Sequence, residues 1–109
     1  MRKTSLAFGN LPTQFMMAGI SRNFETASRI LSLQEFDVNA GAGDWPIIFS
    51  LVDSRSYGIV KLVSENNRTN LYIKNRFDET PDQYADDLGL SVIAGIWRSA
   101  QHSRSSLSE

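Results

Sequence analysis

Three stretches in the middle of the chain are rich in aliphatic and aromatic residues, and two polar clusters separate them. The apolar stretches span residues 45–52, 57–63 and 70–74. The polar clusters, 53–56 and 64–69, contain Asp, Asn and Ser, which favour turns. Runs of β-branched and aromatic residues interrupted by such turns are typical of consecutive β-hairpins. We therefore predict three antiparallel strands in this part of the chain.

The two turns fix the register of the predicted sheet. Asn66-Asn67 favours a two-residue type I′ turn, which sets Leu62 opposite Leu71. A four-residue loop at 53–56 pairs the first two strands. In this register one face of the sheet is apolar, as a half-buried sheet requires. This predicted core face consists of Ile47, Phe49, Leu51, Val60, Leu62, Leu71 and Ile73.

The opposite face of the predicted sheet mixes aliphatic, tyrosine and basic side chains. It consists of Ile48, Ser50, Val52, Tyr57, Ile59, Lys61, Tyr72 and Lys74, with Arg76 just beyond. One interpretation is that a terminus or a helix partly covers its aliphatic residues. The other is that the face docks a partner, because exposed patches of this composition mark interaction sites.

Apolar residues recur at spacings of three and four in the first third of the chain, which predicts an amphipathic helix. The stripe consists of Phe15 or Met16, Ile20, Phe24, Ala27 and Leu31, and it begins after Asn10, a candidate N-cap. We expect a break near residues 21–23, where Ser21 or Asn23 can cap a second helical segment.

A second helix is predicted in the last third of the chain. Thr80 is its expected N-cap, Pro81 its first residue, and Gln83 completes a capping box. Its apolar stripe runs to residue 100 through Tyr84, Leu88, Val92, Ile96 and Ala100. Between the first helix and the sheet, residues 35–40 alternate as a short first strand and 41–44 form a turn.

Together these elements predict an α+β fold. We expect one helix, a meander of three or four antiparallel strands and a second helix, with both helices packed on the core face. The expected organisation is an extended or flexible segment over 1–10, a single domain over 11–102 and a flexible polar tail over 103–109.

The composition of the chain excludes several kinds of functional site. The 109 residues carry a net charge of -1, and the chain contains no cysteine, which excludes disulfides, thiolate zinc sites and cysteine nucleophiles. The positive start at residues 1–3 is followed by an apolar segment that 9–10 and 12–14 interrupt, which does not fit a signal peptide, so we expect a cytoplasmic protein. No apolar run is long enough to span a bilayer, and we expect no membrane partner. His102, the only histidine, lies near the predicted tail and is poorly placed as a general base.

The densest charge cluster consists of Asp78, Glu79, Asp82, Asp86 and Asp87. Acidic side chains at the positive end of a helix account for most of it. The alternatives are an acidic surface for a basic partner and a divalent metal site, although only Asp82 and Asp86 are spaced by four residues. We predict no catalytic residue, no metal ligand and no cofactor.

Two short patches resemble the motifs of RNA-recognition-motif domains. Residues 6–12 resemble the shorter ribonucleoprotein motif of that family, and residues 55–62 resemble the longer one. The resemblance implies an RNA-binding sheet on which Tyr57 stacks a base, with Lys61, Tyr72 and Lys74 beside it.

The preferred prediction is a small non-enzymatic protein-binding module of the inhibitor, immunity or adaptor type. Its partner is a protein of unknown identity or a second copy of the chain, and RNA binding is the alternative. Two surfaces compete for the partner. The predicted binding residues are Ile48, Tyr57, Ile59, Lys61, Tyr72, Lys74 and Arg76 on the sheet face and Asp82, Asp86 and Asp87 at the start of the last helix.

Overall fold

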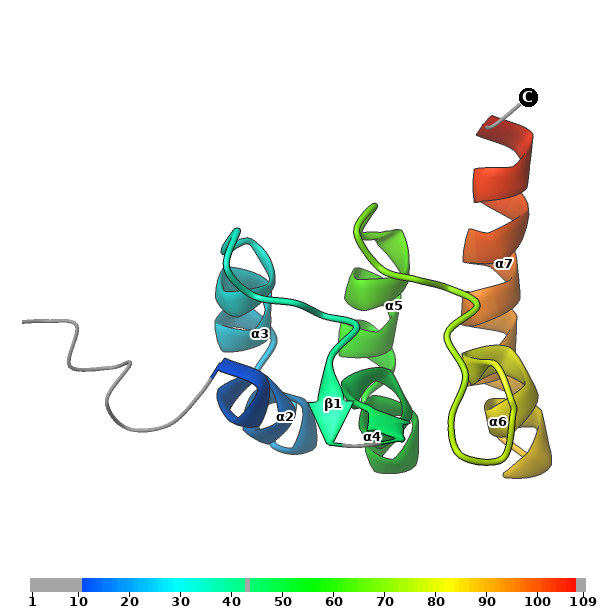
Figure 1. Ribbon diagram of the computed structural model, residues 1–109, viewed down its shortest axis with the longest axis horizontal. Coiled ribbons are helices and arrows are strands. Elements are labelled where there is room, and N and C mark those ends of the chain that lie inside the picture. The colour runs from blue at the N-terminus through cyan, green and yellow to red at the C-terminus, as the bar shows by residue number, and fades with distance from the viewer. Residues whose placement is uncertain (1–10, 43, 108–109) are drawn as a thin grey trace, which may run out of the picture.

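The computed structural model describes residues 11–42 and 44–107, and helices dominate this part of the chain (Figure 1). The helices are α2 (Leu11–Ile20), α3 (Phe24–Leu31), α4 (Ile47–Ser54), α5 (Tyr57–Glu65), α6 (Pro81–Asp87) and α7 (Ser91–Leu107). Two short strands, β1 (Gly41–Ala42) and β2 (Trp45–Pro46), pair antiparallel. Consecutive helices form the pairs α2/α3, α4/α5 and α6/α7.

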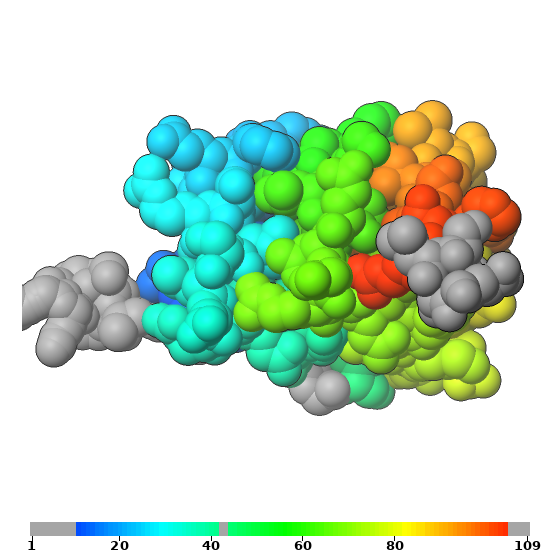
Figure 2. Space-filling view, turned by 90° about the horizontal axis from the view of Figure 1, so that it is seen from above, coloured from blue at the N-terminus to red at the C-terminus, as the bar shows by residue number. Residues whose placement is uncertain are grey.

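The three helix pairs stack side by side, from α2/α3 at the left of Figure 1 to α6/α7 at the right. Helix α4 packs against both α2 and α6, and α5 packs against both α3 and α7. Seen from above in Figure 2, the three pairs follow one another along the molecule in chain order. The main contacts of each pair are therefore with its neighbours, as in solenoid proteins.

Equivalent positions of the three pairs carry similar residues. Prolines recur at intervals of about 34 residues, at or next to the start of the first helix of each pair: Pro12, Pro46 and Pro81. An aromatic residue follows three positions later, as Phe15, Phe49 and Tyr84. The fourth residue of each second helix is buried, namely Ala27, Val60 and Ala94. The seventh residue is buried as well, namely Ile30, Val63 and Trp97. The described chain is thus a threefold repeat of one helix-pair unit.

The turn inside each pair contains a residue with a left-handed backbone conformation. The φ angles are 58° at Arg22, 55° at Arg55 and 76° at Gly89. Glycine adopts this conformation without steric cost, whereas a side chain at the same position is strained. The same turn geometry therefore recurs in all three pairs, and only the third uses glycine for it.

Two arginines tie neighbouring pairs together. Arg68, in the loop after α5, donates hydrogen bonds to the backbone carbonyls of Leu31, Leu33 (3.3 Å) and Phe36 (3.2 Å), at the end of α3 and just beyond it. Arg104 of α7 donates to the carbonyls of Asn66 and Thr69, at the end of α5 and just beyond it. In each case a guanidinium from the following pair donates to carbonyls at and just beyond a helix end, where the α-helical hydrogen-bond pattern stops.

The predicted antiparallel sheet is wrong. Residues 47–52 and 57–63 lie in α4 and α5, and 70–74 form a loop. In the described residues the only strand pairing joins Gly41 with Pro46 and Ala42 with Trp45. The middle pair is covered by a neighbouring pair on both sides, so its helices are apolar around most of their circumference. A short run of apolar residues does not distinguish a buried strand from a buried helix.

The turn and strand predictions around the sheet fail with it. Asn66 is the C-cap of α5, and its side chain accepts a hydrogen bond from the backbone N–H of Arg68 (2.9 Å) instead of belonging to a type I′ turn. Residues 35–40 form turns and irregular loop. Half of the predicted turn at 41–44 is strand β1, and Asp44 lies in the turn before β2; residue 43 is outside the described residues.

The helix signals at the two ends were more informative. The predicted break at 21–23 is confirmed, and the Asn23 side chain caps α3 by accepting from the Thr26 N–H (3.1 Å). Pro81 begins α6, with Thr80 and Gln83 in a capping box. The last helix, however, is two helices, because the chain turns at Gly89. Helix α7 continues to Leu107, into the predicted tail. The predictions for residues 1–10 and 108–109 lie outside the described residues.

No helix within the described ranges has both the length and the apolar character needed to cross a membrane.

Candidate functional site

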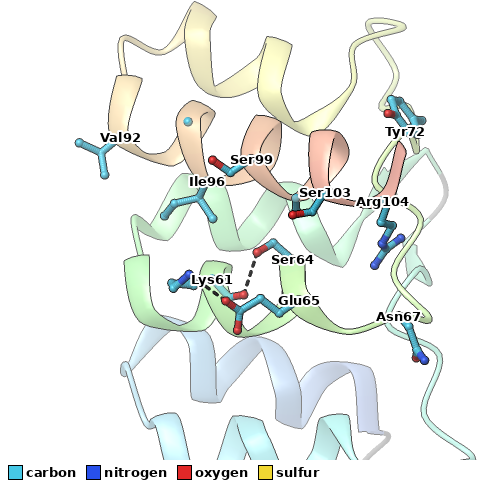
Figure 3. Close-up of a pocket in the computed structure, with 12 residues that line it drawn as sticks. Lys61, Ser64, Glu65, Asn67, Tyr72, Val92, Ile96, Ser99, Ser103 and Arg104 are labelled. Carbon is cyan, nitrogen blue, oxygen red and sulfur yellow. Dashed lines mark hydrogen bonds and ion pairs between the residues drawn. The ribbon is translucent and has the colours of Figure 1, made fainter. Parts of the chain in front are cut away.

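A groove of about 1070 Å³ runs between α5 and α7 (Figure 3). Helix α5 contributes one wall, α7 the other, and the loop after α5 closes one end. The lining residues are Lys61, Ser64, Glu65, Asn67, Tyr72, Val92, Gly95, Ile96, Ser99, Ala100, Ser103 and Arg104.

Small residues on α7 explain why the two helices leave a hollow. Gly95, Ser99 and Ser103 follow one another at every fourth position and therefore share one face of the helix. A Cβ atom built on Gly95 would meet nothing within 4 Å. On the opposite wall Ser64 is buried, and its hydroxyl donates to the Lys61 carbonyl (2.7 Å). No large side chain from either wall fills the space between them.

The exposed apolar residues of the groove lie at its two ends. Val92 marks one end and Tyr72 the other in Figure 3, and they are 59% and 55% exposed. Ile96 and Ala100 lie between them and are partly buried against the core. Apolar side chains that stay exposed along a concave surface are typical of binding sites.

Charged groups line the α5 wall and the loop end. Lys61 Nζ pairs with Glu65 Oε2 at 2.8 Å, one helical turn along α5. Arg104 reaches across the end of the groove and donates to the carbonyls of Asn66 and Thr69. The Arg104 charge is thus used to hold the groove end in place, whereas the Lys61–Glu65 pair is exposed and free to exchange partners.

A cluster of aromatic rings lies on the other side of the same junction. Trp45 contacts Phe49, Phe77 and Tyr84, with ring centroids 5.6, 6.0 and 5.2 Å away. Arg76 lies over the Trp45 ring, 4.9 Å from its centroid, and pairs with Asp44 at 3.3 Å. Burial and the hydrogen bond that the Tyr84 hydroxyl donates to Asp53 (2.6 Å) raise the pKa of Tyr84 to about 12.

The residues predicted for the sheet face do not form one surface. Ile48 and Ile59 are buried in the core. Lys61 and Tyr72 both line the α5/α7 groove. The remaining three lie elsewhere on the surface: Tyr57 at the start of α5, Lys74 paired with Asp78 at 3.3 Å, and Arg76 over Trp45. The predicted docking face is therefore wrong because the sheet that would carry it does not form.

The acidic start of α6 is a structural network that joins α6 to α7. The Asp82 carboxylate accepts hydrogen bonds from Thr80 Oγ1 (2.7 Å), Gln101 Nε2 (3.0 Å) and Arg98 Nε (3.1 Å). Burial raises the pKa of Asp82, but these hydrogen bonds outweigh it, so that the pKa lies below its ordinary value of 3.8. Arg98 also pairs with Asp86.

Within the described residues, no group of three or more His, Asp or Glu side chains could hold a metal ion. Of the predicted binding residues Asp82, Asp86 and Asp87, the first two form ion pairs with Arg98, and Asp87 forms none within residues 11–42 and 44–107.

The groove residues of α7 were missed at the level of the sequence. Val92 and Ile96 were assigned to the apolar stripe of a single long helix, and Ser99 and Ser103 were not singled out. The recurrence of a small residue at every fourth position, at Gly95, Ser99 and Ser103, was the signal that the sequence offered. The resemblance to RNA-recognition motifs also implied the wrong fold, since residues 55–62 form a turn and most of α5.

Comparison with protein-family models, with curated proteins and with solved structures found no match for this chain.

Proposed function

We propose that the chain is a non-enzymatic protein-binding module of the inhibitor, immunity or adaptor type, and that the α5/α7 groove receives a segment of the partner. The observation that carries the proposal is the groove itself, which combines a volume of about 1070 Å³ with exposed Tyr72 and Val92 at its ends. Grooves with apolar anchor points and a polar rim are typical of protein recognition. A chain without cysteine needs no oxidising compartment, which supports a cytoplasmic location.

The repeat architecture supports the same function. A turn and two helices in about 33 residues is the content of an ankyrin-type repeat, and the three helix pairs recur at nearly that interval. Stacks of helix pairs present extended surfaces that are used for binding other proteins. The proposal therefore treats the chain as a short stack of ankyrin-like units.

The shape of the groove favours a helical segment as its occupant. Its walls are two helices, and the Gly95, Ser99 and Ser103 face lets a third helix approach closely. Helices that dock in such grooves place apolar side chains at spacings of three and four against apolar pockets. Ile96 and Ala100 along the floor match that spacing.

The proposal is tested by filling the groove. Ser99→Arg adds a long charged side chain to the groove wall, and Tyr72→Ala removes an anchor at its end. Ser32→Arg adds the same charge at an exposed serine outside the groove. The full chain and the three variants are used to capture proteins from a nuclease-treated cell extract, and the retained proteins are identified by mass spectrometry.

We expect a protein that is retained by the wild type and by Ser32→Arg and lost from Ser99→Arg and Tyr72→Ala. Circular dichroism must show the same helical signal and a similar thermal midpoint for all four chains. If every chain retains the same proteins, the groove is not the binding site. If nuclease treatment removes all specific retention, the partner is a nucleic acid and the protein-binding proposal fails.

A further inference from the structure

A second exposed apolar surface follows the turns between the helices of each pair. Helices α3, α5 and α7 all begin at these turns, and Figure 1 shows α5 and α7 starting at the same lower side of the molecule. The first two turns are in contact, because a Cβ on Gly58 would lie 3.9 Å from the Phe24 ring. We call this surface the turn edge; it comprises residues 20–24, 55–58 and 86–92.

Most of the exposed large hydrophobic residues lie on the turn edge. The described residues contain eight of them, and five belong to this edge: Ile20, Phe24, Tyr57, Leu88 and Val92. They are 42 to 59% exposed, and every turn has at least one. Single exposed hydrophobic residues are ordinary, but a row of them along one edge marks an interaction surface.

Charge is distributed unevenly along the turn edge. Arg22 and Arg55 lie at the first two turns, and Asp86 and Asp87 lie beside the third. Arg22 donates to the Ser54 carbonyl (3.0 Å), and Asp86 pairs with Arg98. Within the described ranges, Arg22, Arg55 and Asp87 take part in no ion pair. The edge is therefore positive at one end and negative at the other.

Other carboxylates near the edge already have partners. Glu25 pairs with Arg29 at 3.1 Å, and Asp53 accepts the hydrogen bond from the Tyr84 hydroxyl. These two carboxylates therefore do not change the net charge pattern of the turn edge, whose first end is positive and whose last end is negative.

We propose that a second copy of this chain docks on the turn edge in the antiparallel sense, giving a twofold-symmetric dimer. In this arrangement the first turn of one copy faces the third turn of the other, so that Arg22 meets the partner's Asp87 twice. The two middle turns meet each other, which places both copies of Tyr57 near the symmetry axis, and the Tyr57 contacts and the charge pairs at the two ends must outweigh the repulsion between the two copies of Arg55 beside it. A surface with opposite charges at its ends and apolar residues along its length is complementary to itself under such a rotation.

The dimer and the proposed function depend on different charged residues, although Val92 belongs to both the turn edge and the groove. Arg22 and Asp87 do not line the α5/α7 groove, so that changing their charges leaves the groove intact. The two ideas can therefore fail separately.

The test uses charge reversal in the full chain, with mass measured by size-exclusion chromatography and light scattering. The wild type should have twice the 12.2 kDa mass of one chain. Arg22→Asp alone and Asp87→Arg alone should each be monomeric, because each places like charges in contact at both ends of the interface. An equimolar mixture of the two variants should recover the dimer, because every introduced charge then faces an opposite one. Aspartate also tolerates the positive φ angle at residue 22.

Glu35→Arg and Lys74→Asp reverse exposed charges away from the edge and should stay dimeric. Tyr57→Ala should weaken the dimer at least tenfold, since it removes a large apolar side chain from both sides of the axis. Three results would each overturn the proposal. The wild type could be monomeric at concentrations of about 100 μM, the single variants could remain dimeric, or the mixture could stay monomeric. Circular dichroism of every variant separates loss of association from loss of fold.

Discussion

The two junctions between helix pairs have the same backbone plan but differ in how completely they are filled. At the first junction, α2/α3 against α4/α5, a Cβ on Gly19 would collide with the Leu51 side chain. At the second, α4/α5 against α6/α7, a Cβ on Gly95 would meet nothing, and the α5/α7 groove opens beside it. The side chains at a junction therefore decide whether a repeat contact becomes core or a candidate binding site.

The aromatic residue that follows each proline should show the difference most strongly. Phe15 is fully buried at the first junction and lies 4.9 Å from the Phe36 ring, whereas Tyr84 is only partly buried at the second. Phe15→Ala should lower the free energy of unfolding by about 3–5 kcal/mol. Tyr84→Ala should lower it by about 1–3 kcal/mol, through lost ring contacts and the hydrogen bond to Asp53. Urea unfolding followed by tryptophan fluorescence measures both values, and equal losses would show that the two junctions are filled alike.

The network at the start of α6 should make the third helix pair, α6/α7, sensitive to acid. The pKa of Asp82 is depressed in the folded state, so its stabilising effect is complete above the ordinary value of 3.8 and disappears as the pH falls through the folded value. Asp82→Ala should cost about 2–3 kcal/mol at neutral pH. Unfolding curves of both proteins, recorded from pH 7 downward, should converge below pH 3.8. A difference that stays constant with pH would mean that the carboxylate charge plays no part.

The two interpair arginines should contribute at both junctions. Lysine keeps the charge, but its compact ammonium group cannot reproduce the planar guanidinium fork that spans separate carbonyls. Arg68→Lys and Arg104→Lys should each lower the free energy of unfolding by about 1–2 kcal/mol. Arg29→Lys is the matched control, because Arg29 forms only an exposed pair with Glu25 and should leave the unfolding midpoint unchanged. If all three variants behave alike, the carbonyl contacts do not stabilise the stack.

The same substitution at two glycines gives the smallest effect and the most direct contrast. Gly95→Ala should stabilise the protein by about 0.5–1 kcal/mol, because α7 gains helix propensity and the groove has room for a methyl group. Gly19→Ala should destabilise it by about 1–2 kcal/mol, because Leu51 must move within a filled core. Thermal and urea unfolding decide the signs, and two changes of the same sign would remove the distinction between a closed and an open junction.

Local signals at helix ends were readable from the sequence. Thr80, Pro81 and Gln83 define the start of α6, and Asn23 caps α3, because a cap depends on a few adjacent residues. Most of the predicted core face is buried as well, including Ile47, Phe49 and Val60. Such apolar residues become buried in either kind of secondary structure.

The type of secondary structure in the middle of the chain could not be read from the same residues. Alternation assigned Ile48, Val52 and Ile59 to an outer sheet face, but all three are buried. Ile48 and Val52 belong to α4, which is buried at most of its positions and lacks the polar face that identifies a helix in a sequence. Ile59 belongs to α5, whose polar residues Lys61 and Glu65 were instead assigned to a strand and a turn. The interval between Pro12, Pro46 and Pro81 was the long-range signal for the fold, and the groove could not be predicted without it.

The arginine contacts link the three helix pairs in series. Arg104 binds the carbonyls of Asn66 and Thr69, and these residues bracket Arg68, which in turn holds the end of α3. Opening of the last turns of α7 would therefore release the loop that carries Arg68, and with it the far end of the molecule. Damage at the C-terminal end would thus extend to the end of α3, two helix pairs away.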